Sequence, residues 1–172
     1  MSTLSKAADD ALERTASTLG WSARHFRPRE FFGWAYRDAT PEAVPWCERF
    51  LAGAEVFPPC SADAWEAVWR SMQRIALELD KLRDELGPLR ITPAGGVRFE
   101  AVHPLKHAEA PGSRHFIGDA ADVVPLRDGV TAADVFALAD REQRNGGMTP
   151  GGAHAYASGF CHIDARSIQA RW

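Results

Sequence analysis

The chain has 172 residues, of which 45% are hydrophobic and 25% are charged, and its formal net charge at pH 7 is −3. This composition is typical of a folded domain and excludes disordered, collagen-like and coiled-coil proteins. The 20 lysines and arginines are balanced by 23 aspartates and glutamates, so the sequence lacks the positive charge of a nucleic-acid-binding domain. We expect a single domain over residues 1–172 that is a monomer with its own hydrophobic core.

The cysteines and the N-terminal sequence bear on the compartment in which the protein is made. Cys47, Cys60 and Cys161 are widely spaced and form no C-x-x-C pair, so we expect buried free thiols rather than disulfides or a zinc knuckle. Residues 1–21 lack the basic start, apolar stretch and cleavage site of a secretory signal. No stretch approaches the ~20 apolar residues that span a bilayer. We therefore expect synthesis in the cytoplasm without a signal peptide, and no membrane span.

The first 60 residues are predicted to form a helical, aromatic-rich N-terminal extension. Apolar residues recur at helical spacing over residues 3–19, and Gly20 stands where a helix would end. Residues 21–59 are rich in aromatic residues and prolines, with a short helix expected over residues 41–51. We expect these rings to cover one flank of the core.

The strongest helical pattern runs over residues 62–86. Its apolar residues follow an i, i+3, i+4, i+7 stripe, Ser61 can cap it, and Gly87-Pro88 can end it. We expect this helix to be the spine of the fold.

Shorter elements complete the predicted domain. Thr131 and Asp134 form a capping-box signature, which predicts a helix that runs to about Arg144. The other expected elements are a strand over residues 89–92, a loop-rich segment over 99–114, a buried strand over 121–124 and two strands within 153–166. Together they predict an α+β fold: a small, mostly antiparallel sheet with flanking helices over residues 61–172, on which the extension packs.

Two sequence segments combine histidines with carboxylates. Asp122 enters a buried strand shortly after His115, and a metal would remove the cost of burying its unpaired charge. In the second segment, the strand period of two places His162 and Asp164 on one face and Cys161 on the other. His115, Asp122 and His162 are then three protein ligands for a tetrahedral Zn²⁺ with one open position. Such an ion activates water and polarises a carbonyl, which favours peptide or ester hydrolysis.

Two motifs carry a resemblance to a known family. They read Ser113-x-His115-x-x-Gly118-x-Ala120-x-Asp122 and Phe160-x-His162-x-Asp164-x-Arg166. They resemble the motifs of the zinc D-Ala-D-Ala metallopeptidases, which include cell-wall DD-carboxypeptidases, phage endolysins and the Hedgehog signalling domain. The resemblance covers residues 77–166 and implies a Hedgehog/DD-peptidase-like fold with one zinc ion. The family's zinc ligands correspond to His115, Asp122 and His162.

The resemblance also implies residues that contact the substrate. The family's Ser-Gly-Tyr-Arg turn, whose arginine binds a substrate carboxylate or carbonyl, corresponds here to residues 95–98. Arg98 is therefore predicted to be catalytic and substrate-binding, although the serine and tyrosine of the turn are absent. Ser113, His154 and Tyr156 are further predicted to contact substrate.

The general base departs from the family pattern. Many members place an acidic residue or a histidine two to six residues before the last zinc ligand, and none stands there in this chain. Asp164 is predicted to be this catalytic base, or else only to orient the imidazole of His162. His154 is the alternative base.

The resemblance implies a zinc-dependent peptidase that hydrolyses peptidoglycan stem or cross-link peptides, as a D-Ala-D-Ala carboxypeptidase or an endopeptidase. Such a protein would act in the cell wall or periplasm after phage-type release or as part of a virion. The alternative is a zinc-stabilised, non-catalytic binding or phage-assembly module of the same fold, which the missing base favours. Both predict bound zinc, and only the first predicts cleavage of peptidoglycan that a chelator inhibits.

Overall fold

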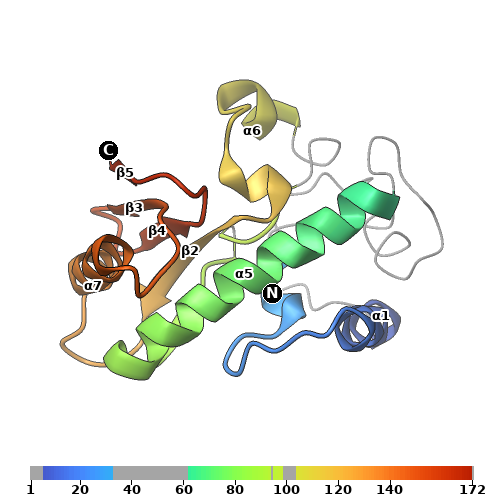
Figure 1. Ribbon diagram of the computed structural model, residues 1–172, viewed down its shortest axis with the longest axis horizontal. Coiled ribbons are helices and arrows are strands. Elements are labelled where there is room, and N and C mark those ends of the chain that lie inside the picture. The colour runs from blue at the N-terminus through green and yellow to red at the C-terminus, as the bar shows by residue number, and fades with distance from the viewer. Residues whose placement is uncertain (1–5, 33–61, 94, 99–103, 172) are drawn as a thin grey trace.

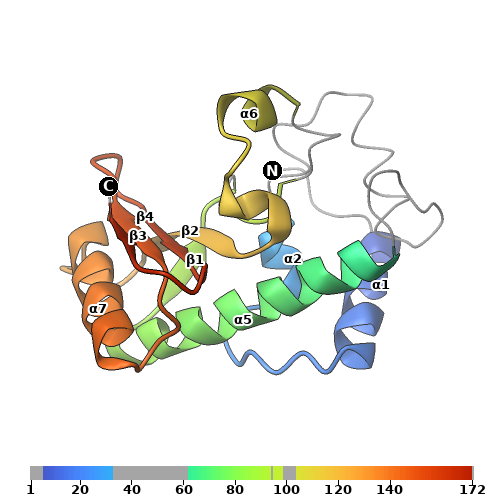
Figure 2. The same cartoon turned by 45° about the horizontal axis from the view of Figure 1, so that its top comes forward.

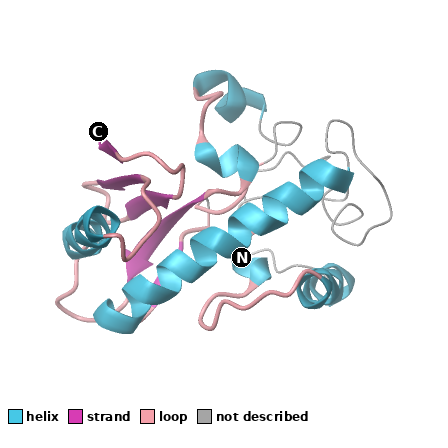
Figure 3. Cartoon of the chain, viewed as in Figure 1, coloured by secondary structure: helices cyan, strands magenta, loops and turns pink. Residues whose placement is uncertain are grey.

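The computed structural model describes residues 6–32, 62–93, 95–98 and 104–171 (Figure 1). Its helices are α1 (Lys6–Thr18), α2 (Pro28–Phe31), α5 (Ala62–Leu86), α6 (Pro104–Glu109) and α7 (Ala132–Asn145), with a 3-10 helix η1 (Arg114–Ile117). Its strands are β1 (Leu89–Ile91), β2 (Ala120–Pro125), β3 (Gly152–Ala155), β4 (Cys161–Asp164) and β5 (Ala170–Arg171) (Figure 3).

The strands form one five-stranded sheet in the order β1-β2-β4-β3-β5. The pairs β1-β2, β2-β4 and β4-β3 are antiparallel, and β3-β5 is parallel. The long helix α5 crosses the molecule beside the sheet, while α7 packs against β2, β3 and β4 (Figures 1 and 2). The predicted α+β fold with a small, mostly antiparallel sheet and flanking helices is confirmed.

Helix α5 forms because its apolar residues return to one side every three or four positions. Its buried apolar side chains are Val68, Trp69, Met72, Ile75, Ala76, Leu79 and Leu82. They belong to one apolar cluster that also contains buried residues of α1, α2, α7 and the sheet. The described residues of the N-terminal region thus share a core with the sheet.

The two faces of the sheet differ in chemistry. Ala121 and Val123 on β2, and Cys161 and Ile163 on β4, belong to the apolar core on the helix-covered face. Because side chains alternate along a strand, Asp122, His162 and Asp164 lie on the opposite face. Cys161 is completely buried within this apolar core, on the face opposite to His162, as strand alternation predicts.

Several expected elements have close counterparts, and others differ. The capping box of α7 is present, with the Thr131 backbone N–H donating to Asp134 Oδ2 at 2.8 Å. The expected loop-rich segment contains α6, since Pro104 is well suited to the first turn of a helix. The two-residue strand β5 was not expected. The helix expected over residues 41–51 lies outside the described residues, as do Cys47 and Cys60.

None of the helices in the described part of the chain combines the length and the apolar character that crossing a membrane requires.

The burial pattern of α5 predicts how stability depends on two of its leucines. Leu79 is fully buried, whereas Leu77 on the same helix is 37% exposed. We expect Leu79→Ala to lower the free energy of unfolding by about 2–5 kcal/mol, because it removes buried surface and leaves a cavity. Leu77→Ala should cost less than about 1 kcal/mol. Urea unfolding of both variants measures the difference, and equal losses would contradict the packing described here.

Candidate metal centre

His115, Asp122 and His162 form the candidate metal cluster. Its first histidine is held by η1. His115 is the second residue of this short helix, which ends at Gly118 with a φ of 70°. A Cβ atom at Gly118 would lie 2.8 Å from the backbone oxygen of Val68 on α5. Glycine is therefore needed for both the positive φ and the close packing, and this turn fixes His115 beside the start of β2.

The other two members of the cluster come from paired strands. Asp122 on β2 and His162 on β4 are direct cross-strand partners, so their side chains are neighbours on one face. His162 Nδ1 lies 2.8 Å from Asp122 Oδ1, and His115 Nε2 lies 3.4 Å from the same oxygen. The two ring nitrogens are 3.3 Å apart. The sequence-predicted ligand set is thus brought together, with its ligand atoms all within 4.8 Å of one another.

Each imidazole has one nitrogen on the Asp122 side and an outer nitrogen that points away from Asp122. The hydrogen bond of the outer nitrogen determines whether the nitrogen on the Asp122 side carries a proton or a lone pair. His115 Nδ1 donates to the backbone oxygen of Gly96 at 2.8 Å, and His162 Nε2 donates to Asp164 Oδ2 at 3.2 Å. A neutral imidazole carries a proton on one nitrogen only. Hence His115 Nε2 and His162 Nδ1 carry lone pairs in the neutral rings, and both lone pairs face Asp122.

This donor set fits a metal ion. Two imidazole lone pairs and a carboxylate oxygen are all acceptors, and without a proton or a cation between them they would repel one another. Ligand atoms about 2.0–2.1 Å from a tetrahedral zinc ion would be roughly 3.3–3.4 Å apart, which matches two of the three distances given above. Among the described residues, this is the group of histidines and carboxylates that could hold a metal ion.

Burial and charge shift the pKa values of all three residues. Burial lowers the pKa of His115 below its usual value, which favours the neutral, metal-binding ring. Burial opposes charge on Asp122 and on His162 as well, but their hydrogen bonds and mutual attraction outweigh it. The pKa of Asp122 is therefore lowered and that of His162 is raised.

Gly95 and Gly96 complete the support of His115. This role of the two glycines was not predicted from the sequence. The Gly95 carbonyl accepts from the Asp122 backbone N–H at 2.8 Å, while the Gly96 carbonyl accepts from His115. A Cβ at Gly96 would lie 1.9 Å from the Phe31 backbone oxygen. The double glycine was the available signal, because adjacent glycines often mark a close approach of two backbones.

Arg98, which the resemblance predicts to contact substrate, lies beside the cluster. Its Nη2 is 3.7 Å from Asp122 Oδ2, and its backbone N–H donates to the His115 carbonyl at 3.0 Å. The guanidinium therefore stands next to the carboxylate oxygen that does not make the close contacts with the two histidines.

Asp164 is on the same face as His162, but on the outer side of its ring. Its Oδ2 meets Nε2, whereas the cluster is built on Nδ1. Both carboxylate oxygens also accept hydrogen bonds from Arg166, and Oδ1 accepts from the Gly152 backbone N–H at 2.7 Å. Burial opposes its charge, yet these hydrogen bonds hold the pKa of Asp164 below its usual value. This geometry corresponds to the orienting role rather than to the predicted general base.

The remaining predicted site residues lie on β3 (His154), directly after β3 (Tyr156) and directly before η1 (Ser113). His154 on β3 is the direct cross-strand partner of His162. Its ring contacts the Tyr156 ring, with centroids 4.5 Å apart, and Tyr156 stacks on Phe160. Ser113 precedes η1, and its carbonyl accepts from the Phe116 backbone N–H at 3.2 Å. Their substrate-binding roles remain predictions.

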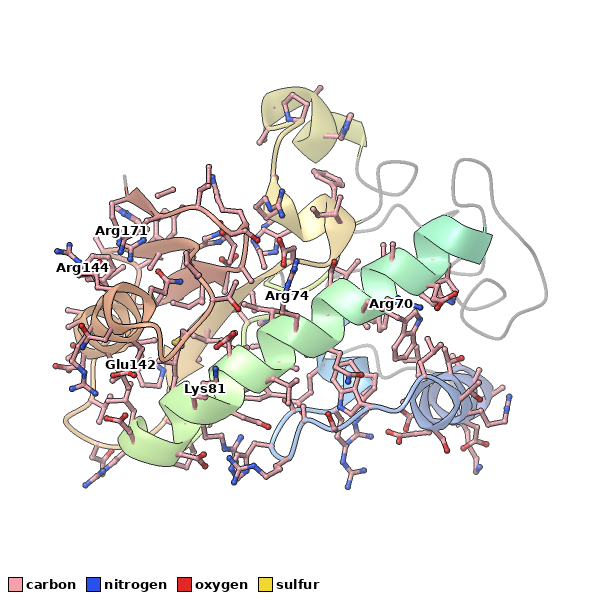
Figure 4. All side chains as sticks on the ribbon, viewed as in Figure 1. Arg70, Arg74, Lys81, Glu142, Arg144 and Arg171 are labelled. Carbon is pink, nitrogen blue, oxygen red and sulfur yellow. The ribbon has the colours of Figure 1, made fainter. Side chains whose placement is uncertain are left out.

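Another buried carboxylate, Asp119, was not predicted from the sequence. Its side chain is fully buried and forms ion pairs with Arg74 of α5 and Arg114 of η1. Arg74 lies on α5 (Figure 4), and its Nη2 is 2.6 Å from Asp119 Oδ1. These pairs tie the segment between η1 and β2 to α5. No local signal reveals the pair with Arg74, because Arg74 is 45 residues away from Asp119.

The close approach at Gly96 predicts a specific effect on metal binding. We expect Gly96→Ala to weaken zinc binding about 10–100-fold, because the added methyl group displaces the carbonyl that orients His115. Gly112→Ala is the matched control, since a Cβ there meets no atom within 4 Å. Competition with a chromophoric chelator measures both affinities, and equal affinities would contradict this role of Gly96.

The raised pKa of His162 predicts the pH dependence of metal binding. Zinc requires neutral imidazoles, and the pKa of His162 lies above the ordinary 6.5. As the pH falls, protons should therefore compete with zinc while the pH is still above 6.5, with affinity decreasing about tenfold per pH unit.

Chelator competition between pH 5.5 and 8.5 tests this profile, and a constant affinity would contradict it. Cys161→Ala should show the same profile, because burial raises the pKa of the Cys161 thiol to about 12 and the thiol lies on the other face of the sheet.

Comparison with known proteins finds no matching family model, no matching curated protein and no matching solved structure. The function must therefore be argued from the geometry of the site and the motifs that form it. That geometry is a buried His-Asp-His cluster that could hold a metal ion.

Proposed function

We propose that this chain is a zinc-dependent peptidase. The observation that carries the proposal is the convergence of His115 Nε2, Asp122 Oδ1 and His162 Nδ1, with the outer nitrogen of each ring held by an acceptor. Three protein ligands of this kind leave one position open, which is the pattern of catalytic rather than structural zinc sites. Two imidazole nitrogens and one carboxylate oxygen are also the donor set of known catalytic zinc sites.

Zinc bound to these ligands would activate water for attack on a peptide carbonyl and would polarise that carbonyl. The chain's own residues would orient the substrate and move protons. Arg98, beside Asp122, would bind a carbonyl or carboxylate of the substrate. Asp164 would hold the ring of His162 in the metal-binding orientation.

We assign the role of general base to His154 rather than to Asp164. Asp164 is engaged by Arg166, Gly152 and His162, whereas His154 neighbours His162 across the strand pair on the cluster's face of the sheet. Tyr156 and Ser113 would contribute to the walls of the substrate site. Tyr156 is 37% exposed beside His154.

The substrate class follows from the resemblance to zinc D-Ala-D-Ala metallopeptidases with a Hedgehog/DD-peptidase-like fold. On that basis the substrate is a peptidoglycan stem or cross-link peptide, cleaved as by a carboxypeptidase or an endopeptidase. Action on the cell wall would then follow phage-type release or delivery in a virion, and the protein would work as a monomer.

One observation favours a second candidate function. Asp164, the residue predicted to be the general base, is fully buried and held by several donors. A chain that lacks a base would still bind zinc and would serve as a non-catalytic binding or phage-assembly module.

Digestion of purified peptidoglycan distinguishes the two functions. We expect the zinc-loaded protein to release peptide fragments or D-alanine, detectable by mass spectrometry, and a chelator to abolish this release. Arg98→Ala should lower kcat/KM by about 10²–10³ if its guanidinium stabilises developing charge. Arg144→Gln is the control, since Arg144 pairs with Asp140 on α7 at the edge of the molecule (Figure 4). Bound zinc without hydrolysis of any peptidoglycan type would favour the binding module.

A further inference from the structure

The chain immediately after β4 folds back onto Asp164. Arg166 Nε lies 2.9 Å from Asp164 Oδ1 and 3.1 Å from Oδ2, and its Nη2 also binds Oδ2. The Arg166 backbone N–H adds a contact to Oδ1 at 3.3 Å. The Arg166 side chain therefore contacts both oxygens of this carboxylate, and its backbone also contacts Oδ1.

The backbone around Arg166 supports this arrangement. Ser167 has a φ of 67°, and it is the one non-glycine residue with a positive φ in the described part of the chain. This conformation is unfavourable for serine and is retained only where surrounding contacts enforce it. It turns the chain directly after Arg166. On the other side, a Cβ at Gly151, the residue just before β3, would lie 1.7 Å from the Asp164 carbonyl oxygen, so the chain that enters β3 also approaches Asp164 closely.

We infer that Arg166 is a positioning residue for the metal centre, which acts through Asp164 on His162. This inference rests on the proposed zinc site and deepens it. Asp164 is the acceptor for His162 Nε2–H, and that hydrogen bond directs the Nδ1 lone pair at the cluster. Arg166 in turn fixes the position of Asp164 Oδ2.

Because Asp164 is buried, its hydrogen bonds with Arg166 are important for the orientation of His162. The Asp164 side chain is fully buried, whereas that of Arg166 is 27% exposed. Water has little access to Asp164, so the guanidinium supplies the hydrogen bonds that water would otherwise give. Without Arg166, the carboxylate would keep its donors from Gly152 and His162 but would lose the fork that sets its rotamer. The His162 ring would then be less firmly oriented, and zinc affinity would decrease.

A double-mutant cycle in zinc affinity tests the inference. The zinc dissociation constants of the unmodified chain, Arg166→Gln, Asp164→Asn and the double variant are measured by chelator competition. We expect Arg166→Gln to raise the dissociation constant about 10–100-fold, as is typical when a group behind a metal ligand is lost. In the Asp164→Asn background, the same change should raise it less than about twofold, because the residue through which Arg166 acts has been altered.

A spectroscopic measurement separates positioning from general stability. With Co²⁺ in place of zinc, Arg166→Gln should change the visible ligand-field bands, while Arg144→Gln should leave them unchanged. Arg166→Lys, which keeps the charge but not the planar fork, should give an intermediate zinc affinity. It also serves as the test variant if Arg166→Gln does not fold.

The outcomes distinguish this inference from the proposed function. Unchanged zinc affinity in Arg166→Gln and Arg166→Lys, or an equal loss in the Asp164→Asn background, would overturn the role of Arg166 while leaving the zinc site intact. Failure of the unmodified chain to bind zinc would overturn both. Zinc binding that depends on Arg166 without peptide hydrolysis would support the inference and count against the peptidase.

Discussion

The central constraint in this structure is a buried carboxylate between two imidazole nitrogens. Asp122 is largely shielded from water and lies within 2.8 and 3.4 Å of His162 and His115. Such a group is stable only if positive charge or donated hydrogen bonds compensate for its lost hydration. Because the outer nitrogens of both rings already donate elsewhere, neutral rings offer Asp122 only lone pairs. A cation is the simplest partner for three acceptors that face one another.

Much of the surrounding fold serves to hold these acceptors in place. The antiparallel register of β2 and β4 makes Asp122 and His162 neighbours, and the turn at Gly118 brings η1 against α5. The Gly96 carbonyl and the Asp164 carboxylate orient the two rings from behind. Each of these supports is buried, so the site is fixed before any ligand enters. A site fixed in this way suits chemistry that depends on precise placement.

The sequence predicted those features that depend on local patterns. The helix over residues 62–86 was predicted from its apolar stripe, and α7 from the capping box at Thr131. Strand alternation was sufficient to separate Cys161 from His162. Likewise, the three residues of the cluster were predicted, because they stand at fixed positions of the two motifs.

Other features could not be predicted because they depend on contacts between distant segments or on ring orientation. Alternation places Asp164 and His162 on one face, but it cannot show that Asp164 meets Nε2 rather than the cluster. The pairing of Asp119 with Arg74 joins residues 45 positions apart, and the contact of Gly96 with Phe31 requires two backbones to meet. Strand β5 has two residues, too few to show a period.

The most direct test of the proposed zinc site is X-ray absorption spectroscopy at the zinc edge on the purified, zinc-loaded protein. We expect one zinc ion per chain, with nitrogen and oxygen ligands at about 2.0–2.2 Å, the multiple-scattering pattern of two imidazoles and no sulfur at about 2.3 Å. Asp122→Asn and His162→Ala should each reduce the bound zinc. A zinc-free protein, a sulfur ligand or full zinc retention in both variants would contradict zinc binding by His115, Asp122 and His162.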